Sequence, residues 1–243
     1  MTLLPRAILF DLDDTLISLG RRPQLLAEVA EEFAADVTPP GPARLAEALE
    51  TAFRAFWSDA ERHKSGRMDL TAARLGIVTE VFADLRRQSP GLAPETARAF
   101  AARFDAYRED QIRFFPGALE AIDELKRRGV KLALVTNGAA AVQRAKIERF
   151  DLAHRFDHIQ IEGEAGFGKP EAQAYHHAMA ALGVQAHETW MVGDNLEWEV
   201  AAPQRLSIYA IWHDHLGEGL PEDSAVRPDR IIRSIGELTE NLN

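Results

Sequence analysis

Acidic side chains follow directly after a short apolar segment near the start of the chain. Arg6–Phe10 is a mostly apolar run, and Asp11, Asp13 and Asp14 come immediately behind it. Alternate residues of an extended chain project to the same side, so we expect the first two of these carboxylates to lie together. Clustered carboxylates repel one another unless a cation neutralises them, and hard oxygen ligands suit Mg²⁺. The spacing indicates a metal site, and an acidic loop that caps a strand is the alternative.

Residues suited to binding phosphate occur further along the chain. Thr136 and Asn137 follow the apolar run Lys131–Val135, and both can donate hydrogen bonds to a phosphate oxygen. Lys169 lies in the stretch GFGKP, where an ammonium group can neutralise phosphate or carboxylate charge. Taken singly these are weak signals, because Asn-Gly is a common turn and most lysines lie on the surface.

A second acidic group follows another apolar run. Thr189–Val192 leads through a glycine to Asp194, with Glu197 and Glu199 close behind. This is the fourth polar group of the chain, and three of the four stand directly after predicted strands. Their combination in this order favours one site that handles a phosphate group with the help of a metal.

Short apolar runs predict the strands that must position these residues. The runs are Arg6–Phe10, Lys131–Val135, Thr189–Val192, Ser207–Ile211 and, more weakly, His158–Ile161. Helical patterns lie between them, at Ala118–Arg128, Ala140–Phe150 and Glu171–Leu182. This alternation predicts an α/β fold with a doubly wound, Rossmann-like parallel sheet, in which ligands bind at the carboxyl ends of the strands. The stretch PDRIIRSIGEL near the end predicts a short strand and a final helix.

Residues 19–112 have a different character, because their pattern is helical throughout. We expect helices at about 24–35, 42–58, 69–88 and 94–110, separated by TPPGP, KSGR and SPGLAP. The sequence therefore predicts two domains: residues 1–18 with 113–243 form the sheet-containing core, and residues 19–112 form an all-helical insert.

Composition excludes several classes of protein. The 243 residues include no cysteine, which rules out disulfides, thiolate zinc sites and a cysteine nucleophile. A net charge of -10 argues against nucleic-acid binding, which usually needs a basic surface. No secretory signal or membrane-spanning stretch is recognisable, so we expect a cytoplasmic protein with neither a nucleic acid nor a membrane as partner. A monomer and a homodimer both remain open.

Taken together, the polar groups resemble those of the haloacid dehalogenase-like hydrolase superfamily. The four motifs match in order: DLDDT at 11–15, Thr136 with Asn137, Lys169 with Pro170, and Gly193 with Asp194. The resemblance covers the whole chain, and the helical insert resembles the family's helical cap of the first type. The combination is specific for the superfamily and far less specific for a substrate.

The resemblance implies a role for each matching residue. Asp11 is the nucleophile that forms an aspartyl-phosphate, and Asp13 is the general acid and then the general base. Thr136 and Lys169 hold the phosphoryl group. Asp194 joins Asp11 and the main-chain carbonyl of Asp13 in binding Mg²⁺. A carboxylate nucleophile and charge neutralisation by a metal and a lysine suit phosphoryl transfer.

The fourth motif departs from the family pattern. Where the family usually continues to a second acid, most often aspartate, this chain has Trp198 and Glu199. The longer side chain of Glu199 can still hold a metal-bound water, so we expect it in the metal shell, with Glu197 as the other candidate.

These features predict a Mg²⁺-dependent phosphatase that acts on a small phosphorylated metabolite. A haloacid dehalogenase of the same fold is an alternative, although members of that kind lack an acid at the position of Asp13. A phosphomutase uses the same motifs, and a non-catalytic binding protein that retains the fold is a third possibility.

Specificity is expected from the helical insert. Residues 53–67 are locally basic, which favours contact with an anionic substrate, whereas a solvated helix face is the alternative. The expected substrate-binding residues, besides Asn137 and Thr136, are Arg54, Arg62, Lys64 and Arg67, with Trp57 and His63 beside them.

Overall fold

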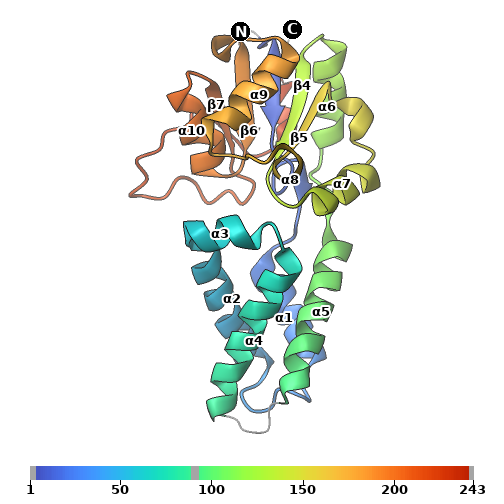
Figure 1. Ribbon diagram of the computed structural model, residues 1–243, viewed down its shortest axis with the longest axis vertical. Coiled ribbons are helices and arrows are strands. Elements are labelled where there is room, and N and C mark those ends of the chain that lie inside the picture. Colours follow the sequence, from blue (N-terminus) through green and yellow to red (C-terminus); the bar gives the residue numbers. More distant parts are fainter. Residues whose placement is uncertain (1–3, 89–92, 241–243) are drawn as a thin grey trace. The chain divides into compact units, whose positions relative to one another are not determined.

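The computed structural model describes residues 4–88 and 93–240 (Figure 1). The chain divides into two compact units. One combines the N-terminal segment through Ser18 with the chain from Arg113 onward, and the other is Leu19–Ile112. The first unit contains the sheet, and the second is helical.

Strand β1 (Ala7–Phe10) lies inside a parallel sheet of six strands with the order β5-β4-β1-β6-β7-β8. It pairs on one side with β4 (Lys131–Thr136) and on the other with β6 (Thr189–Gly193). The chain first builds the sheet outward on the β4 side and then returns to build it outward on the β6 side. The carboxyl ends of β1, β4 and β6 therefore surround the point where the strand order reverses, the usual ligand position in such sheets.

The outer strands complete the predicted α/β fold. They are β5 (His158–Ile161), β7 (Tyr209–His213) and β8 (Arg230–Ile232). The predicted sheet is confirmed, but the strand expected at Ser207–Ile211 begins two residues later. Ser207 has a positive φ of 63°, so it belongs to the turn before β7.

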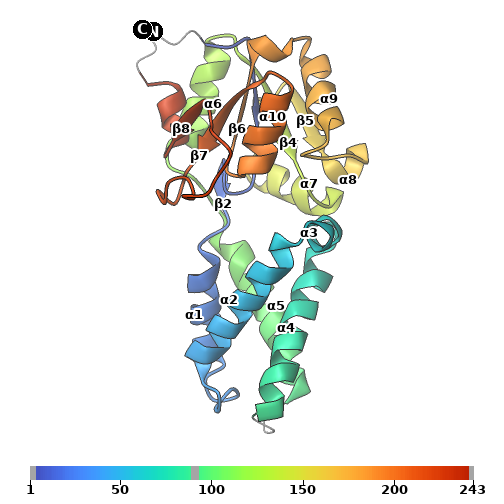
Figure 2. The same cartoon turned by 90° about the vertical axis from the view of Figure 1, so that its left-hand side faces the viewer.

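Helices cover both faces of this sheet. They are α6 (Ala118–Arg127), α7 (Ala140–Arg149), α8 (Glu162–Ala165), α9 (Ala172–Leu182) and α10 (Ala202–Arg205). The side chains of Ala7 and Leu9 pack in one apolar cluster with α9, whereas α6 lies across the sheet from α9 (Figures 1 and 2). Strand alternation turns Ile8 and Phe10 to the opposite face, and all four residues are fully buried.

Short helical turns fill several connections of this unit. They are the 3₁₀ turns η1 (Ala153–Arg155), η2 (Ala186–Glu188) and η4 (Ile235–Leu238), and the π-helical turn η3 (Leu196–Ala201). The final helix predicted from the sequence is only η4. Ser234 caps it by accepting the Gly236 N–H at 3.2 Å, and the turn ends after four residues.

The insert contains five described helices. They are α1 (Arg22–Glu32), α2 (Pro42–Ser58), α3 (Ala60–Gly66), α4 (Leu70–Gln88) and α5 (Pro94–Gln111). Helix α3 was not expected, because KSGR reads as a turn. Asp59 begins this helix by accepting the Arg62 N–H at 2.9 Å, so KSG forms the end of a helix and only Arg67 belongs to the turn. The predicted break SPGLAP falls largely on residues 89–92, outside the described residues.

Side chains from these helices form an apolar core of their own, including Leu26, Leu49, Phe53, Phe100 and Phe104. At the two ends of the insert, β2 (Ile17–Ser18) pairs antiparallel with β3 (Arg113–Phe114). Across residues 4–88 and 93–240, the helices are all too short or too polar to cross a bilayer.

Candidate active site

A buried lysine joins two carboxylates at the carboxyl edge of the sheet. Lys169 Nζ lies 2.6 Å from Asp11 Oδ1 and 2.8 Å from Glu199 Oε1, and its side chain is 1% exposed. Asp11 stands directly after β1, and its other oxygen accepts a hydrogen bond from Thr15 Oγ1 at 3.1 Å. Both oxygens of Asp11 are therefore held, which fixes the orientation of this carboxylate.

The cluster is unusually rich in negative charge. Burial above all raises the pKa of Asp11, Asp194 and Glu199, to about 7 for Glu199, and repulsion among the carboxylates adds to this rise. Burial alone would lower the pKa of Lys169, but the carboxylates of Asp11 and Glu199 outweigh it and raise that pKa. Two carboxylates contact the Lys169 ammonium group, and the carboxylate of Asp194 interacts electrostatically with both of them. A further cation is therefore electrostatically favoured here.

Both carboxylate oxygens of Glu199 contact other groups of the protein. While Oε1 faces the buried lysine, Oε2 accepts the Asn195 N–H at 2.8 Å. A Cβ at Gly193 would clash with the Glu199 side chain, so only glycine allows this approach at the end of β6. Glu197 is exposed and forms an ion pair with Arg205 at 2.6 Å.

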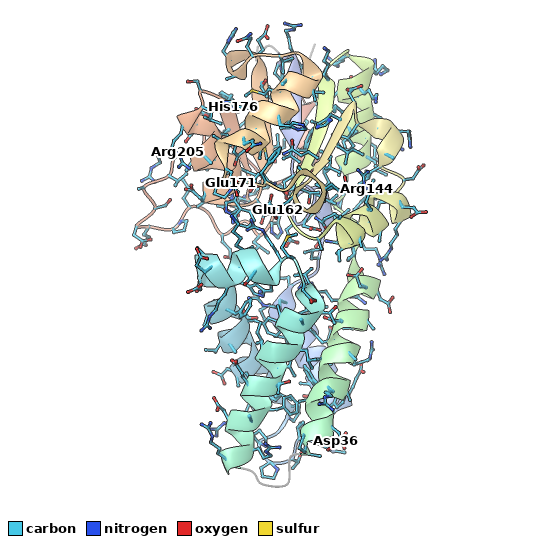
Figure 3. All side chains as sticks on the ribbon, in the orientation of Figure 1. Asp36, Arg144, Glu162, Glu171, His176 and Arg205 are labelled. Atoms are coloured by element: carbon cyan, nitrogen blue, oxygen red, sulfur yellow. The ribbon has the colours of Figure 1, made fainter. Side chains whose placement is uncertain are left out.

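Loop contacts set the position of the lysine. Asn137 donates from Nδ2 to the Lys169 carbonyl at 2.7 Å and accepts the Lys169 N–H at 2.9 Å. Gly168 allows this pairing, since a Cβ there would lie 2.6 Å from Asn137 Oδ1. Glu162, labelled in Figure 3, accepts the Gly138 N–H at 2.9 Å. The asparagine expected to contact substrate thus ties together the loops after β4 and β5.

Asp13 is held by helix α7. Lys146 Nζ lies 2.7 and 2.8 Å from the two oxygens of the Asp13 carboxylate. Gln143 Nε2 donates to Asp13 Oδ2 at 3.0 Å and also to the Thr136 hydroxyl. The residue expected to act as acid and base is therefore linked through one side chain to the threonine expected to bind phosphate.

Gln143 and Lys146 did not emerge from the sequence as functional residues, although a signal was present. They stand three residues apart on one face of α7, beside Ile147, and these three are the buried residues of the helix. Two long polar side chains occupy positions where an amphipathic helix normally presents apolar ones.

His213 supports the loop that follows β1. Its Nδ1 lies 3.2 Å from the Asp14 carbonyl, and its ring packs edge-on against Phe115. Burial, followed by the charge of His215, lowers the pKa of His213 to about 4. The ring is therefore neutral near pH 7, and Nδ1 donates its hydrogen to the carbonyl. Asp14 itself has a positive φ of 54°, so this contact stabilises a sparsely populated backbone conformation.

The basic residues of the insert differ in exposure. Arg54, Arg62 and Lys64 are exposed, whereas Arg67 is 8% exposed. Arg54 lies 3.5 Å from Glu50, and the rings of Trp57 and His63 pack edge-on. Three cationic side chains, those of Arg54, Arg62 and Lys64, are therefore accessible on the helical insert.

Comparison with known proteins shows the family. Residues 5–206 match the haloacid dehalogenase-like hydrolase family. Phosphoserine phosphatase of Thermus thermophilus is 34% identical over 255 residues, which cover 96% of this chain and 97% of that protein. Ribulose-1,5-bisphosphate 5-phosphatase of Halopiger xanaduensis is 29% identical, with coverage of 96% and 98%.

Solved structures show the same fold. The hydrolase YfnB of Bacillus subtilis, bound to magnesium, has a TM-score of 0.66 at 22% identity and covers 99% of this chain and 100% of its own. L-2-haloacid dehalogenase of Xanthobacter autotrophicus has a TM-score of 0.65 at 18% identity, with the same coverage. The expected family and the inserted helical region, consistent with a cap of the first type, are thereby confirmed. This chain belongs to the haloacid dehalogenase-like hydrolases, on the phosphatase side of that family.

Proposed function

We propose that this protein hydrolyses a phosphomonoester of a small metabolite through an aspartyl-phosphate on Asp11, with Mg²⁺ as cofactor. The observation that carries the proposal is the placement of Asp13. Its carboxylate is linked through Gln143 to Thr136, at the same edge of the sheet as the buried pair of Asp11 and Lys169. An acid at this position supplies the proton that an alkoxide leaving group requires.

The donor set fits a hard divalent cation. Asp11, Asp194 and the main-chain carbonyl of Asp13 would hold Mg²⁺, which commonly binds through one or two carboxylates together with phosphate and water. Among the described residues, no three side chains of metal-binding type are close enough to hold an ion alone, so main-chain and substrate oxygens belong to the proposal. When bound, Mg²⁺ would neutralise charge on the phosphoryl oxygens. We propose a supporting role for Glu199 in place of the expected ligand role, because its carboxylate pairs with Lys169 and the Asn195 N–H and the residue is only 1% exposed, whereas Asp11 is 7% exposed.

Protein side chains then perform two successive steps. In the first, an Asp11 oxygen bonds to phosphorus while the ester bond breaks, and Asp13 gives its proton to the departing oxygen. In the second, Asp13 takes a proton from water as that water attacks phosphorus, which releases inorganic phosphate and restores Asp11. Lys169 and Thr136 hold the phosphoryl oxygens throughout, and this positioning is the main source of catalysis in phosphoryl transfer.

The relatives support a small substrate. Their names give phosphoserine, ribulose 1,5-bisphosphate and, for a Methanopyrus kandleri protein of 24% identity, glyceraldehyde 3-phosphate as substrates. We propose that Arg54, Arg62 and Lys64 contact an anionic part of such a molecule, with the buried Arg67 shaping that surface.

The test measures release of p-nitrophenol from p-nitrophenyl phosphate with Mg²⁺ and with EDTA. The wild type should be active only with the metal, and Asp11→Asn should be inactive at equal protein concentration. Equal release of p-nitrophenol by both proteins, or release that does not depend on Mg²⁺, would contradict the proposal. A panel of phosphorylated metabolites then identifies the substrate, and formation of an isomeric phosphate instead of inorganic phosphate would point to a mutase.

A further inference from the structure

Helix α7 presents a polar face to the protein interior. Its three buried residues are Gln143, Lys146 and Ile147, with Gln143 2% and Lys146 6% exposed. Lysine is almost never this deeply buried unless its ammonium group is paired, since an unpaired buried charge is costly. The helix therefore contains a lysine whose position needs an explanation.

The ammonium group of this lysine contacts both oxygens of one carboxylate. Nζ of Lys146 lies 2.7 Å from Oδ1 and 2.8 Å from Oδ2 of Asp13, whose side chain is 27% exposed. Contact with both oxygens restrains rotation of the carboxylate more strongly than one hydrogen bond does. The partner of this buried lysine is thus the residue proposed as acid and base.

The hydrogen-bond polarity around Gln143 follows from its partners. In the ionised form that faces the Lys146 ammonium, the Asp13 carboxylate only accepts, so the Gln143 atom that contacts it is the amide nitrogen. The same nitrogen contacts Thr136 Oγ1, so this hydroxyl accepts there and keeps its own hydrogen for another acceptor. Gln143 thereby aims the Thr136 hydroxyl hydrogen away from α7, as a donor to phosphate requires.

We propose that Lys146 and Gln143 are positioning residues, which hold Asp13 and Thr136 in the relative arrangement that proton transfer to the leaving oxygen requires. The inference rests on the proposed function of Asp13. Neither residue belongs to the four sequence motifs, and each acts through a side chain that does. Loss of Lys146 removes the contact with Asp13 Oδ1 and one of the two contacts with Oδ2, which weakens the restraint on this carboxylate. Displacement of a catalytic group by about 1 Å can cost about 100-fold in rate.

A leaving-group series tests the role of Lys146 directly. The probes are p-nitrophenyl, phenyl and benzyl phosphate, in order of increasing need for a proton on the departing oxygen. The ratio kcat/KM reports steps only up to departure of that group, so the later hydrolysis of the aspartyl-phosphate does not enter. Lys146→Met should lose less than about 3-fold on p-nitrophenyl phosphate and about 10- to 100-fold on benzyl phosphate.

Arg144 provides a matched control on the same helix. It is exposed, labelled on α7 in Figure 3, and pairs with Glu164 at 2.5 Å. Arg144→Met removes one positive charge from α7 without touching Asp13, and should leave all three kcat/KM values within about 2-fold of the wild type.

The absence of cysteine allows a chemical rescue at this one position. Lys146→Cys introduces the sole thiol of the chain, and 2-bromoethylamine converts it to a close analogue of lysine. Aminoethylation should restore kcat/KM on benzyl phosphate by about 10-fold or more, while wild type treated in parallel should not change. A purely structural role for Lys146 would not give recovery specific to the poor leaving group.

The outcomes separate this inference from the proposed function. If the wild type shows no Mg²⁺-dependent hydrolysis of any probe, the proposed function fails. If the wild type is active and Lys146→Met loses equally on all three probes, or loses nothing, only the positioning role fails. Circular dichroism checks the fold of each variant, and Lys146→Gln, which keeps a donor, replaces Lys146→Met if that variant unfolds.

Discussion

The two units of this protein bury very different side chains. Of the thirteen buried polar or charged side chains that the structure describes, twelve lie in the unit with the sheet, and only Arg67 lies in the insert. The insert packs an almost purely apolar core around residues such as Leu49 and Phe100. Burying charge costs free energy unless it is paired, so a fold keeps such groups mainly where they are used.

The difference agrees with a location of the proposed chemistry in the sheet unit. In the sheet unit, Asp11, Lys169 and Glu199 form a network in which each charge depends on its neighbours. Removing one member should therefore affect both activity and stability. In the insert, a core substitution should reduce stability and leave the chemistry of a small substrate intact.

The largest effect is expected for Lys169→Met. Loss of this ammonium leaves Asp11 and Glu199 buried without their common cation, which should cost about 3–5 kcal/mol in the free energy of unfolding. Hydrolysis of p-nitrophenyl phosphate should fall by about 10⁴-fold or more. Urea denaturation and a phosphatase assay measure the two effects.

Lys126→Met is the control for that variant. Lys126 forms a more exposed ion pair with Asp157 at 3.7 Å, and its loss should cost less than about 1 kcal/mol without changing activity. A similar cost for both lysines would show that burial of the Lys169 pairs adds nothing to their effect on stability.

Leu49→Ala, in the insert, should lower stability without lowering activity. Leu49 is fully buried in the apolar core, so the cavity should lower the free energy of unfolding by about 2–5 kcal/mol. Below the unfolding temperature, kcat on p-nitrophenyl phosphate should remain within about 3-fold of the wild type. Met68→Ala, at a residue 42% exposed, should change stability by no more than about 0.5 kcal/mol.

The pH dependence of stability should reflect His213. Burial lowers its pKa to about 4 in the folded protein, so the unfolded chain binds the proton more tightly. Stability should fall as the pH drops from about 6.5 toward 4, by up to roughly 3 kcal/mol from this residue alone. His213→Gln should flatten the curve over this range, whereas His187→Gln, at an exposed position, should not. Parallel curves for all three proteins would exclude His213 as the source.

The smallest effects are expected at the exposed cations of the insert. Arg54→Met and Lys64→Met should leave stability and hydrolysis of p-nitrophenyl phosphate unchanged, because both side chains are exposed. Each should lower kcat/KM on an anionic metabolite by about 2- to 5-fold, the size of a screened charge contact. Equal kcat/KM values for wild type and both variants on the preferred metabolite would remove these residues from the specificity surface.

Local patterns were sufficient to predict most elements of the sheet unit. β5 lies where HIQI indicated, and α6 and α9 agree with their predicted limits to within one residue. These elements could be predicted because an apolar run or a glycine at a helix end involves only residues that are close together in the sequence. Helix α3 was missed because its cap at Asp59 outweighs the turn that KSGR suggests.

The motif residues were recognisable for the same reason, whereas their partners were not. Asp11, Asp13 and Asp194 follow strands and Thr136 ends one, so topology brings them to one edge once a parallel sheet is assumed. Asn137 was expected to contact substrate, yet its amide pairs with the backbone of Lys169, a contact across 32 residues that no local pattern encodes.

By itself, the sequence determined the fold class and the family, and it predicted the residues proposed to carry chemistry, because each depends on short segments with recognisable spacing. Only the tertiary structure decided which side chains hold those residues. Lys146 contacts Asp13 across 133 positions of the sequence, and Glu199 pairs with Lys169 from the π-helical turn η3. Such pairs form because packing removes these side chains from water, and a charge buried in this way is stable only beside a group of opposite sign.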